Sequence, residues 1–349
     1  MKKQDYWFND SQVDDYTSYF NENGFCVITN ILEDKEISNA LQEIWTHPAL
    51  LGNSNIVENN PETWNIDIDN IGFLDLNGGY SHTELKYYWK TCFNEKIIKI
   101  YQTLYNDNIK FKNDRYGFMR PTKNIQMTDG SLIDKPEWKT KKKWLHVDMN
   151  PWKIQDYLRI QGLLTFTDQT ETSGGFCCIP RFHKKIVDWS KNNTPNDREI
   201  ISDIFYFDKD SKEQNNIINL IVPKGSLILW DRRIPHCNYP NDDNTFRIVQ
   251  YLHYELEEHI TNTITQTHIK LGLEHKLLPK DSYFPNKLTE KQLELIDYNK
   301  YKDIITTERE LEGYKKYKRA CALETDGKYI EATKLYSLAF KMCPILEKI

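Results

Sequence analysis

Residues 225–236 read GSLILWDRRIPH, and this stretch decides the fold. After the glycine, the continuous apolar run from Ser226 to Trp230 is typical of a short strand buried on both faces. Residues 158–167 and 245–254 are also rich in residue types that favour strands, and we expect strands there as well. Turn-forming residues such as Ser173-Gly174-Gly175 separate these runs. The spacing favours an antiparallel sandwich or barrel.

The composition of the chain is that of a globular protein. Of its 349 residues 39% are hydrophobic, 28% are charged and 13% are aromatic, and the high aromatic content indicates a thick β core. The net charge of -5 predicts neither a nucleic-acid partner nor binding to an acidic membrane. A lysine-rich run at 139–143 is either a solvated loop or a lip that attracts an anionic substrate.

The cysteines and the apolar runs predict a cytoplasmic location. The seven cysteines include no CxxC pair, and their irregular spacing fits a reducing intracellular compartment. The polar segment Met1–Asp10 does not resemble a signal peptide, and no apolar run is long enough to cross a bilayer.

Helices are expected on both sides of the β region. Residues 24–28 indicate a short buried strand, after which Glu33 and Glu36 open a helix. A second helix is expected over 84–105, because its apolar residues form a stripe. We interpret residues 50–82 as loop with short strands, and the polar segment 187–218 as an insertion, a lid or a plain surface loop.

The chain becomes helical again after Thr289. Gly327, Ala332, Ala339 and Pro344 fall at the spacings of a tetratricopeptide-type helical hairpin over about 314–344. This hairpin is a single unit, and repeats of this kind are normally stable when stacked. It is either a helical pair docked on the main domain or a module that binds a protein partner. We therefore divide the chain into a domain at 1–288 and a helical segment at 289–349.

A His-x-Asp pattern at His146 and Asp148 suggests a metal site. In a strand, residues two apart project from the same face, so an imidazole and a carboxylate can reach one ion. The pattern alone is common. His236 lies 90 residues later, behind the glycine-led strand, and completes two histidines and one carboxylate. This donor set suits iron(II), because it leaves open positions for a bidentate 2-oxo acid and for dioxygen.

Arg247 supplies the next element of the predicted site. It follows His236 by eleven residues, after the turn-forming stretch 238–244. A hairpin would bring it back beside the strand that carries His236. Its planar guanidinium pairs well with the distal carboxylate of a 2-oxo diacid such as 2-oxoglutarate. Taken alone, Arg247 would be an ordinary surface ion pair and His236 a core histidine, whereas the ordered set argues against both interpretations.

With these residues the sequence resembles the phytanoyl-CoA dioxygenase family of iron(II)- and 2-oxoglutarate-dependent oxygenases. The resemblance runs from about Tyr19 to Tyr254. It departs from the family at Arg181-Phe182, where Gly-Ser is usual. The matching elements are residues 24–28, His146-Val147-Asp148, the strand with Gln161, residues 168–183, residues 225–236 and Arg247.

The resemblance implies a mainly β fold with helices. Its core would be a double-stranded β-helix, of the jelly-roll or cupin-like kind, with flanking helices and the C-terminal hairpin. Gln161 would face the cosubstrate or be an edge-strand residue. Asn238 would touch the bound carboxylate or, more simply, belong to a turn. Trp152 would wall the substrate pocket or pack in the core, and His183 would be structural.

The sequence thus predicts a dioxygenase with iron(II) as its metal, and 2-oxoglutarate and dioxygen as cosubstrates. Such an enzyme typically hydroxylates a C–H bond. Its substrate, a small molecule or a protein, is not indicated by the sequence. One alternative is a non-catalytic module of the same fold that recruits a partner through its C-terminal helices, although the intact ligand set argues against it. Another is an oxygenase-fold enzyme with a different metal or without a 2-oxo acid, which Arg247 disfavours.

Overall fold

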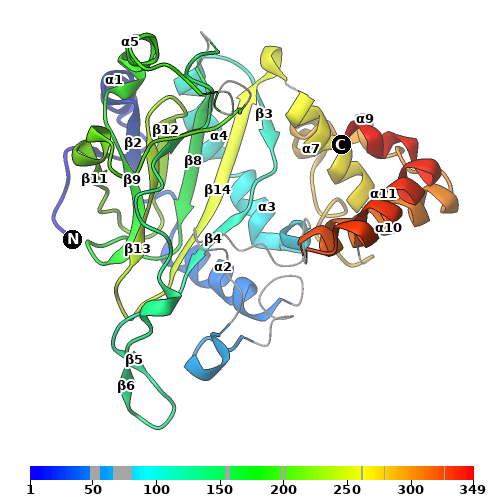
Figure 1. Cartoon of the computed structure of the whole chain (residues 1–349), viewed down its shortest axis with the longest axis horizontal. Coiled ribbons are helices and arrows are strands. Elements are labelled where there is room, and N and C mark those ends of the chain that lie inside the picture. Colours follow the sequence, from blue (N-terminus) through cyan, green and yellow to red (C-terminus); the bar gives the residue numbers. More distant parts are fainter. Residues whose placement is uncertain are drawn as a thin grey trace.

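The computed structural model contains two large β-sheets that face each other, with helices outside them (Figure 1). It describes residues 1–47, 56–65, 81–153, 158–196, 199, 202–260, 262–278, 280–325 and 327–349. The seven-stranded sheet has the order β1 (Trp7–Phe8), β2 (Phe25–Ile28), β12 (Leu227–Asp231), β8 (Ile160–Thr165), β14 (Arg247–Leu256) and β3 (Ile109–Lys112), with β4 (Tyr116–Met119) also paired to β14. The five-stranded sheet has the order β10 (Phe205–Tyr206), β7 (His146–Val147), β13 (His236–Asn241), β9 (Ser173–Cys178) and β11 (Ile218–Asn219).

The six strands that form the core of the fold alternate between the two sheets. β7, β8 and β9 lie in the five-, seven- and five-stranded sheet in turn, and β12, β13 and β14 continue the alternation. This winding is that of a jelly roll, and the predicted double-stranded β-helix is confirmed. The three strands expected at 158–167, 226–230 and 245–254 are also confirmed, as β8, β12 and β14.

The two faces of β14 have different surroundings, because successive side chains of a strand point to opposite sides. Ile248 and Leu252 pack with the helices in one hydrophobic cluster. Val249 packs with Phe176 of the opposite sheet in another. The odd-numbered residues of β14, from Arg247 to Glu255, therefore face the space between the sheets.

Four helices cover the outer face of the larger sheet (Figure 1). They are α1 (Val13–Asn23), α2 (Asp34–Thr46), α3 (Lys86–Cys92) and α4 (Glu95–Tyr105). The predicted start of α2 is confirmed, because Glu33 and Glu36 form a capping box. The single helix expected over 84–105 is interrupted. The side chain of Asn94 accepts hydrogen bonds from the amides of Lys96 and Ile97 at 2.9 and 3.3 Å, and so begins a new helix there.

Two turns predicted from the sequence are wrong. Ser173-Gly174-Gly175 begins β9 instead of forming a turn, and Asn238 lies inside β13, paired with Phe176. The expected hairpin is also wrong, because β13 and β14 lie in opposite sheets. The chain crosses between the sheets after Asn241, so Arg247 faces the site from the other side.

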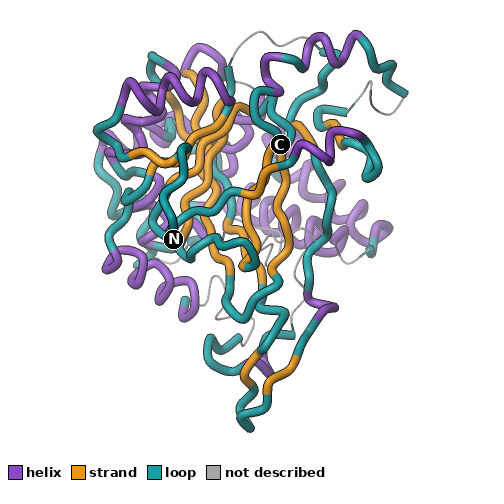
Figure 2. Tube along the Cα trace, turned by 90° about the vertical axis from the view of Figure 1, so that its left-hand side faces the viewer, coloured by secondary structure: helices purple, strands orange, loops and turns teal. Residues whose placement is uncertain are grey.

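The segment 187–218 completes the smaller sheet. Its described residues contain β10 and β11, which pair with β7 and β9 as edge strands, and helix α5 (Ile186–Lys191) precedes them. Figure 2 shows a hairpin of β5 (Ile125–Gln126) and β6 (Leu132–Ile133) that projects below the body of the protein. The predicted loop at 50–82 lies mostly outside the described residues.

The C-terminal part is helical, as predicted. It contains α7 (Asn262–Glu274), α8 (Glu290–Leu295), α9 (Tyr298–Tyr301), α10 (Glu308–Thr325) and α11 (Tyr329–Met342). Short 3₁₀ helices lie at Pro61–Thr63, Ser81–Glu84, Pro136–Trp138, Phe182–Lys184, Lys212–Asn216, Glu257–His259 and Pro344–Lys348.

The helices α10 and α11 form the expected hairpin, which is docked on α7. The Tyr314 hydroxyl donates a hydrogen bond of 2.6 Å to Glu274 of α7, and Lys318 approaches the same carboxylate at 3.1 Å. Within the hairpin, Gly313 of α10 permits a close approach to α11, because a Cβ at Gly313 would lie 2.8 Å from the Cβ of Met342. None of the described helices is both long and apolar enough to cross a membrane.

Candidate metal centre and substrate cavity

The structure brings His146, Asp148 and His236 together. His146 on β7 and His236 on β13 are directly paired, and Asp148 lies one residue beyond the end of β7. One oxygen of Asp148 is 3.4 Å from Nε2 of His146, and the other is 3.4 Å from Nε2 of His236. One ligand atom from each residue can be chosen so that all lie within 4.8 Å of one another, and both histidines are buried.

Backbone carbonyls set the orientation of both imidazoles. Nδ1 of His236 is 3.0 Å from the carbonyl of Ile234, and Nδ1 of His146 is 3.3 Å from that of Trp144. A carbonyl can only accept a hydrogen bond, so Nδ1 of each ring is the donor and Nε2 is the ring atom that faces Asp148.

The charge states favour a cation between these three side chains. Burial lowers the pKa of His236, and His146 acts in the same direction, so the ring is neutral. Burial would raise the pKa of Asp148, but hydrogen bonds from His146 and His236 hold it well below its usual value, so this group is a carboxylate. Two imidazole nitrogens and one carboxylate therefore converge, which is the donor set that a divalent iron would fit.

Gln161 on β8 supports the carboxylate. Its amide nitrogen donates a hydrogen bond of 2.7 Å to Oδ2 of Asp148, while its Oε1 has no partner in the described part of the chain. The side chain thus holds the ligand in place and leaves one acceptor toward the cavity. The structure favours this positioning role over the edge-strand interpretation.

Arg247 is a buried cation without a hydrogen-bond partner among the described residues. Its side chain is fully buried at 0% exposure, and none of its guanidinium nitrogens makes a hydrogen bond within the described residues. An uncompensated buried charge is costly, so this site fits a carboxylate ligand. Arg247 lies on the same face of β14 as the cavity residues Tyr251 and His253, but it does not itself line the cavity.

Asn238 and Trp152 differ in their relation to the cavity. Asn238 on β13 lines it and donates to the Tyr251 hydroxyl at 3.2 Å, while its Oδ1 has no partner within the described ranges. Trp152 does not line the cavity, so its predicted role as a pocket wall is corrected. Its indole donates to the carbonyls of Ser190 and Asn193 at 3.1 and 2.7 Å, which ties it to the chain around α5.

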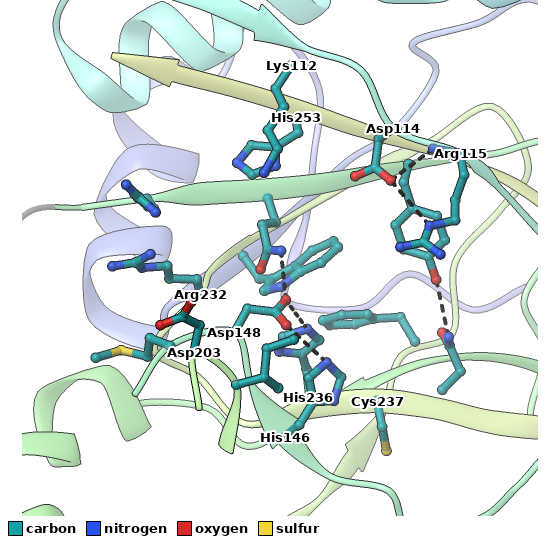
Figure 3. Close-up of a pocket in the computed structure, with 18 of the residues that line it drawn as sticks. Lys112, Asp114, Arg115, His146, Asp148, Asp203, Arg232, His236, Cys237 and His253 are labelled. Carbon is teal, nitrogen blue, oxygen red and sulfur yellow. Dashed lines mark hydrogen bonds and ion pairs between the residues drawn. The ribbon is translucent and has the colours of Figure 1, made fainter. Parts of the chain in front are cut away.

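The cavity has a volume of about 810 Å³ and lies between the sheets, beside the histidines. In Figure 3, His146, Asp148 and His236 lie together, whereas Lys112 and His253 lie together at another wall. Aromatic residues complete the metal side of the cavity, namely Trp144, Phe176, Tyr206 and Trp230.

The sequence analysis missed the residues at the wall away from the metal ligands. Lys112, Arg159, Arg232 and His253 all line the cavity, although each appears ordinary in the sequence. The period-two pattern of 247–255 could have indicated His253, since it shares a face with Arg247. No local signal could have indicated Lys112, because its place depends on the pairing of β3 with β14.

The comparisons with known proteins agree with the expected family. Residues 81–249 match the family model "Phytanoyl-CoA dioxygenase (PhyH)". A Dictyostelium discoideum protein named "Putative phytanoyl-CoA dioxygenase" is 23% identical over 277 residues, which cover 67% of this chain and 73% of the relative.

Two solved structures show a more distant likeness. The epimerase SnoN, in complex with Fe3+, alpha ketoglutarate and nogalamycin RO, is 9% identical, with a TM-score of 0.48 over 71% of this chain and 85% of that one. EctD from S. alaskensis, with 2-oxoglutarate and 5-hydroxyectoine, is 13% identical, with a TM-score of 0.43 over 69% of this chain and 75% of that one. At these scores the likeness has no bearing on the activity of this chain.

Proposed function

Residues 81–249 of this chain belong to the phytanoyl-CoA dioxygenase family, and on that premise we propose that the protein is an iron(II)- and 2-oxoglutarate-dependent dioxygenase. The observation that carries the proposal is the convergence of two imidazole Nε2 atoms and the carboxylate of Asp148. The donor set is the one expected of a non-heme iron site that keeps open positions. Its reaction would oxidise a C–H bond of a small-molecule substrate, normally by hydroxylation.

In the proposed site, His146, Asp148 and His236 hold the iron. When bound there, iron(II) would couple the decarboxylation of 2-oxoglutarate by dioxygen to oxidation of the substrate. The carbonyls of Trp144 and Ile234 keep both rings in the tautomer that binds metal, and Gln161 keeps Asp148 in place. The aromatic lining would limit access of water to the reacting groups.

We assign the distal carboxylate of 2-oxoglutarate to Arg247. The assignment is supported by the complete burial of this guanidinium and by its lack of a partner among the described residues. Asn238 and Gln161 each keep one unpartnered oxygen beside the cavity, and we propose that they contribute to the same cosubstrate site.

We also propose that the catalytic domain spans 1–288 and that 289–349 form a C-terminal appendage. The contacts of Tyr314 and Lys318 with Glu274 support a docked structural role for the hairpin. Nothing in the described part of the chain indicates a partner at this hairpin. A reducing, cytoplasmic location is supported by the seven cysteines, all of them free thiols.

The proposed activity is tested with the whole chain under anaerobic conditions. Addition of iron(II) and 2-oxoglutarate is expected to produce the weak visible charge-transfer band of an iron–2-oxo acid chelate. Aeration is then expected to release succinate, slowly alone and faster with a true substrate. Absence of both the band and succinate would overturn the proposal.

Gln161 provides a prediction about metal affinity. Gln161→Leu removes the amide that donates to Asp148, so the carboxylate loses its orientation. We expect iron(II) affinity to fall about 10- to 100-fold, as is usual when a residue that hydrogen-bonds to a metal ligand is lost. Anaerobic iron titration with a competing chelator measures this. Gln161→Glu provides a second comparison, because a carboxylate there would repel Asp148. Unchanged affinity in both variants would exclude the positioning role.

A further inference from the structure

A row of side chains crosses the floor of the cavity on four adjacent strands. His253 of β14 is paired with Lys112 of β3 on one side and with Gln161 of β8 on the other. Gln161 is paired in turn with Trp230 of β12. Directly paired residues share a face of the sheet, and all four residues line the cavity. The row therefore leads from Gln161, which holds the metal ligand Asp148, to Lys112.

Two of the cations that line the cavity with Lys112 have a neighbouring carboxylate. Arg159 lies 2.9 Å from the buried carboxylate of Glu255, and Arg115 lies 3.8 Å from Asp114. Lys112 differs, since no carboxylate lies within 4.0 Å of its ammonium in the part of the chain that the structure describes. Asp114 and Glu255 favour the ammonium only from a longer distance, so the described residues supply Lys112 with no counter-ion in direct contact.

The surroundings make this unpaired cation costly. Burial lowers the pKa of Lys112, because the cavity removes much of the water that would solvate the ammonium. Burial also holds the pKa of the adjacent His253 well below its usual value, so its imidazole is neutral. Nε2 of that ring has no hydrogen-bond partner among the described residues. An ammonium and an imidazole therefore face the cavity side by side (Figure 3).

We propose that the substrate is a small organic molecule with a carboxylate or phosphate group, and that Lys112 and His253 bind this group at the wall away from the metal ligands. An anion would neutralise Lys112 through charge-assisted hydrogen bonds, which are the strong ones in a partly dry site. The inference rests on the proposed function for the metal side of the cavity, and it names the substrate class of that site.

The dimensions support a small molecule. The volume of about 810 Å³ falls within the usual range for small-ligand pockets and is too small for a folded partner. Lys112 and Gln161 are two strand spacings apart, which is about 10 Å between their backbones. The anionic group and the oxidised C–H bond would accordingly lie a short chain of carbon atoms apart.

The first experiment measures anion binding without iron or 2-oxoglutarate. Inorganic phosphate and, separately, butyrate are titrated into the whole chain while tryptophan fluorescence is followed, because Trp144 and Trp230 line the cavity. We expect saturable binding of at least one anion, at least tenfold weaker in Lys112→Met and nearly unchanged in Lys112→Arg. Lys141→Met, which removes an exposed lysine, is the matched control. Failure to bind either anion, or equal binding by Lys112→Met, would overturn the inference.

The second experiment identifies the class of anion through turnover. Short carboxylic acids and phosphate monoesters are compared with their amides and alcohols for stimulation of succinate formation. We expect only the charged member of a pair to stimulate, and Lys112→Met to lose that stimulation while keeping the iron–2-oxoglutarate band. Stimulation by neutral members alone would contradict the inference. Lys112-dependent anion binding without the band would instead overturn only the proposed function.

Discussion

Replacement of His236 by alanine is expected to abolish iron retention and to lower succinate formation by more than about 100-fold. The loss of activity should exceed the 10- to 100-fold that is typical when a residue hydrogen-bonded to a ligand is replaced, because here a ligand itself is removed. His236 supplies one of the two imidazole lone pairs that face Asp148, and no other histidine among the described residues joins this cluster. Iron content after desalting and succinate release under air measure the two effects.

The His236→Ala variant needs a test of folding, because the ring packs against Phe176 and Trp230. In His236→Gln, the glutamine side chain fills most of the space of the imidazole ring. This variant is expected to fold normally while still losing the iron. His259→Ala, which removes a partly exposed histidine outside the cavity, serves as the control. The assignment of this ligand would be refuted if a folded His236→Gln protein retained iron and turned over at the level of the unaltered chain.

Arg247→Met is expected to have opposite effects on cosubstrate binding and on stability. Without the guanidinium, the distal carboxylate of 2-oxoglutarate loses a buried, charge-assisted pair, and such a loss typically costs about 3–5 kcal/mol. We therefore expect 2-oxoglutarate to bind on the order of 100- to 5000-fold more weakly. The anaerobic chelate band, titrated with 2-oxoglutarate at saturating iron(II), gives the affinity directly.

The same substitution is expected to raise the melting temperature of the ligand-free protein. Arg247 is fully buried and its nitrogens have no partners in the described part of the chain, so the unliganded fold holds an uncompensated charge. Methionine has a similar length and removes that cost. Added 2-oxoglutarate should stabilise the unaltered chain and leave Arg247→Met unaffected. A variant that is less stable and still binds 2-oxoglutarate normally would show that Arg247 has a purely structural role.

Much of the core architecture follows from local sequence. The apolar runs that became β8, β12 and β14 are continuous enough to indicate buried strands, and Glu33 and Glu36 marked the start of α2 through its capping box. The break at Asn94 was missed because its neighbours continue an apolar helical stripe. The turn expected at Asn238 was wrong because pairing with Phe176 draws a turn-forming residue into a strand.

By itself, the sequence determined the three candidate metal ligands, because two histidines and one carboxylate form a donor set that can be recognised from residue types and order alone. Only the tertiary structure decided which other side chains meet that site. Lys112 reaches the cavity because β3 pairs with β14, and Trp152 is kept from it by the hydrogen bonds that its indole makes near α5. Arg247 faces the site from the sheet opposite His236. Period and composition specify which face of a strand is buried, whereas the pairing of strands distant in the chain selects the neighbours that share that face.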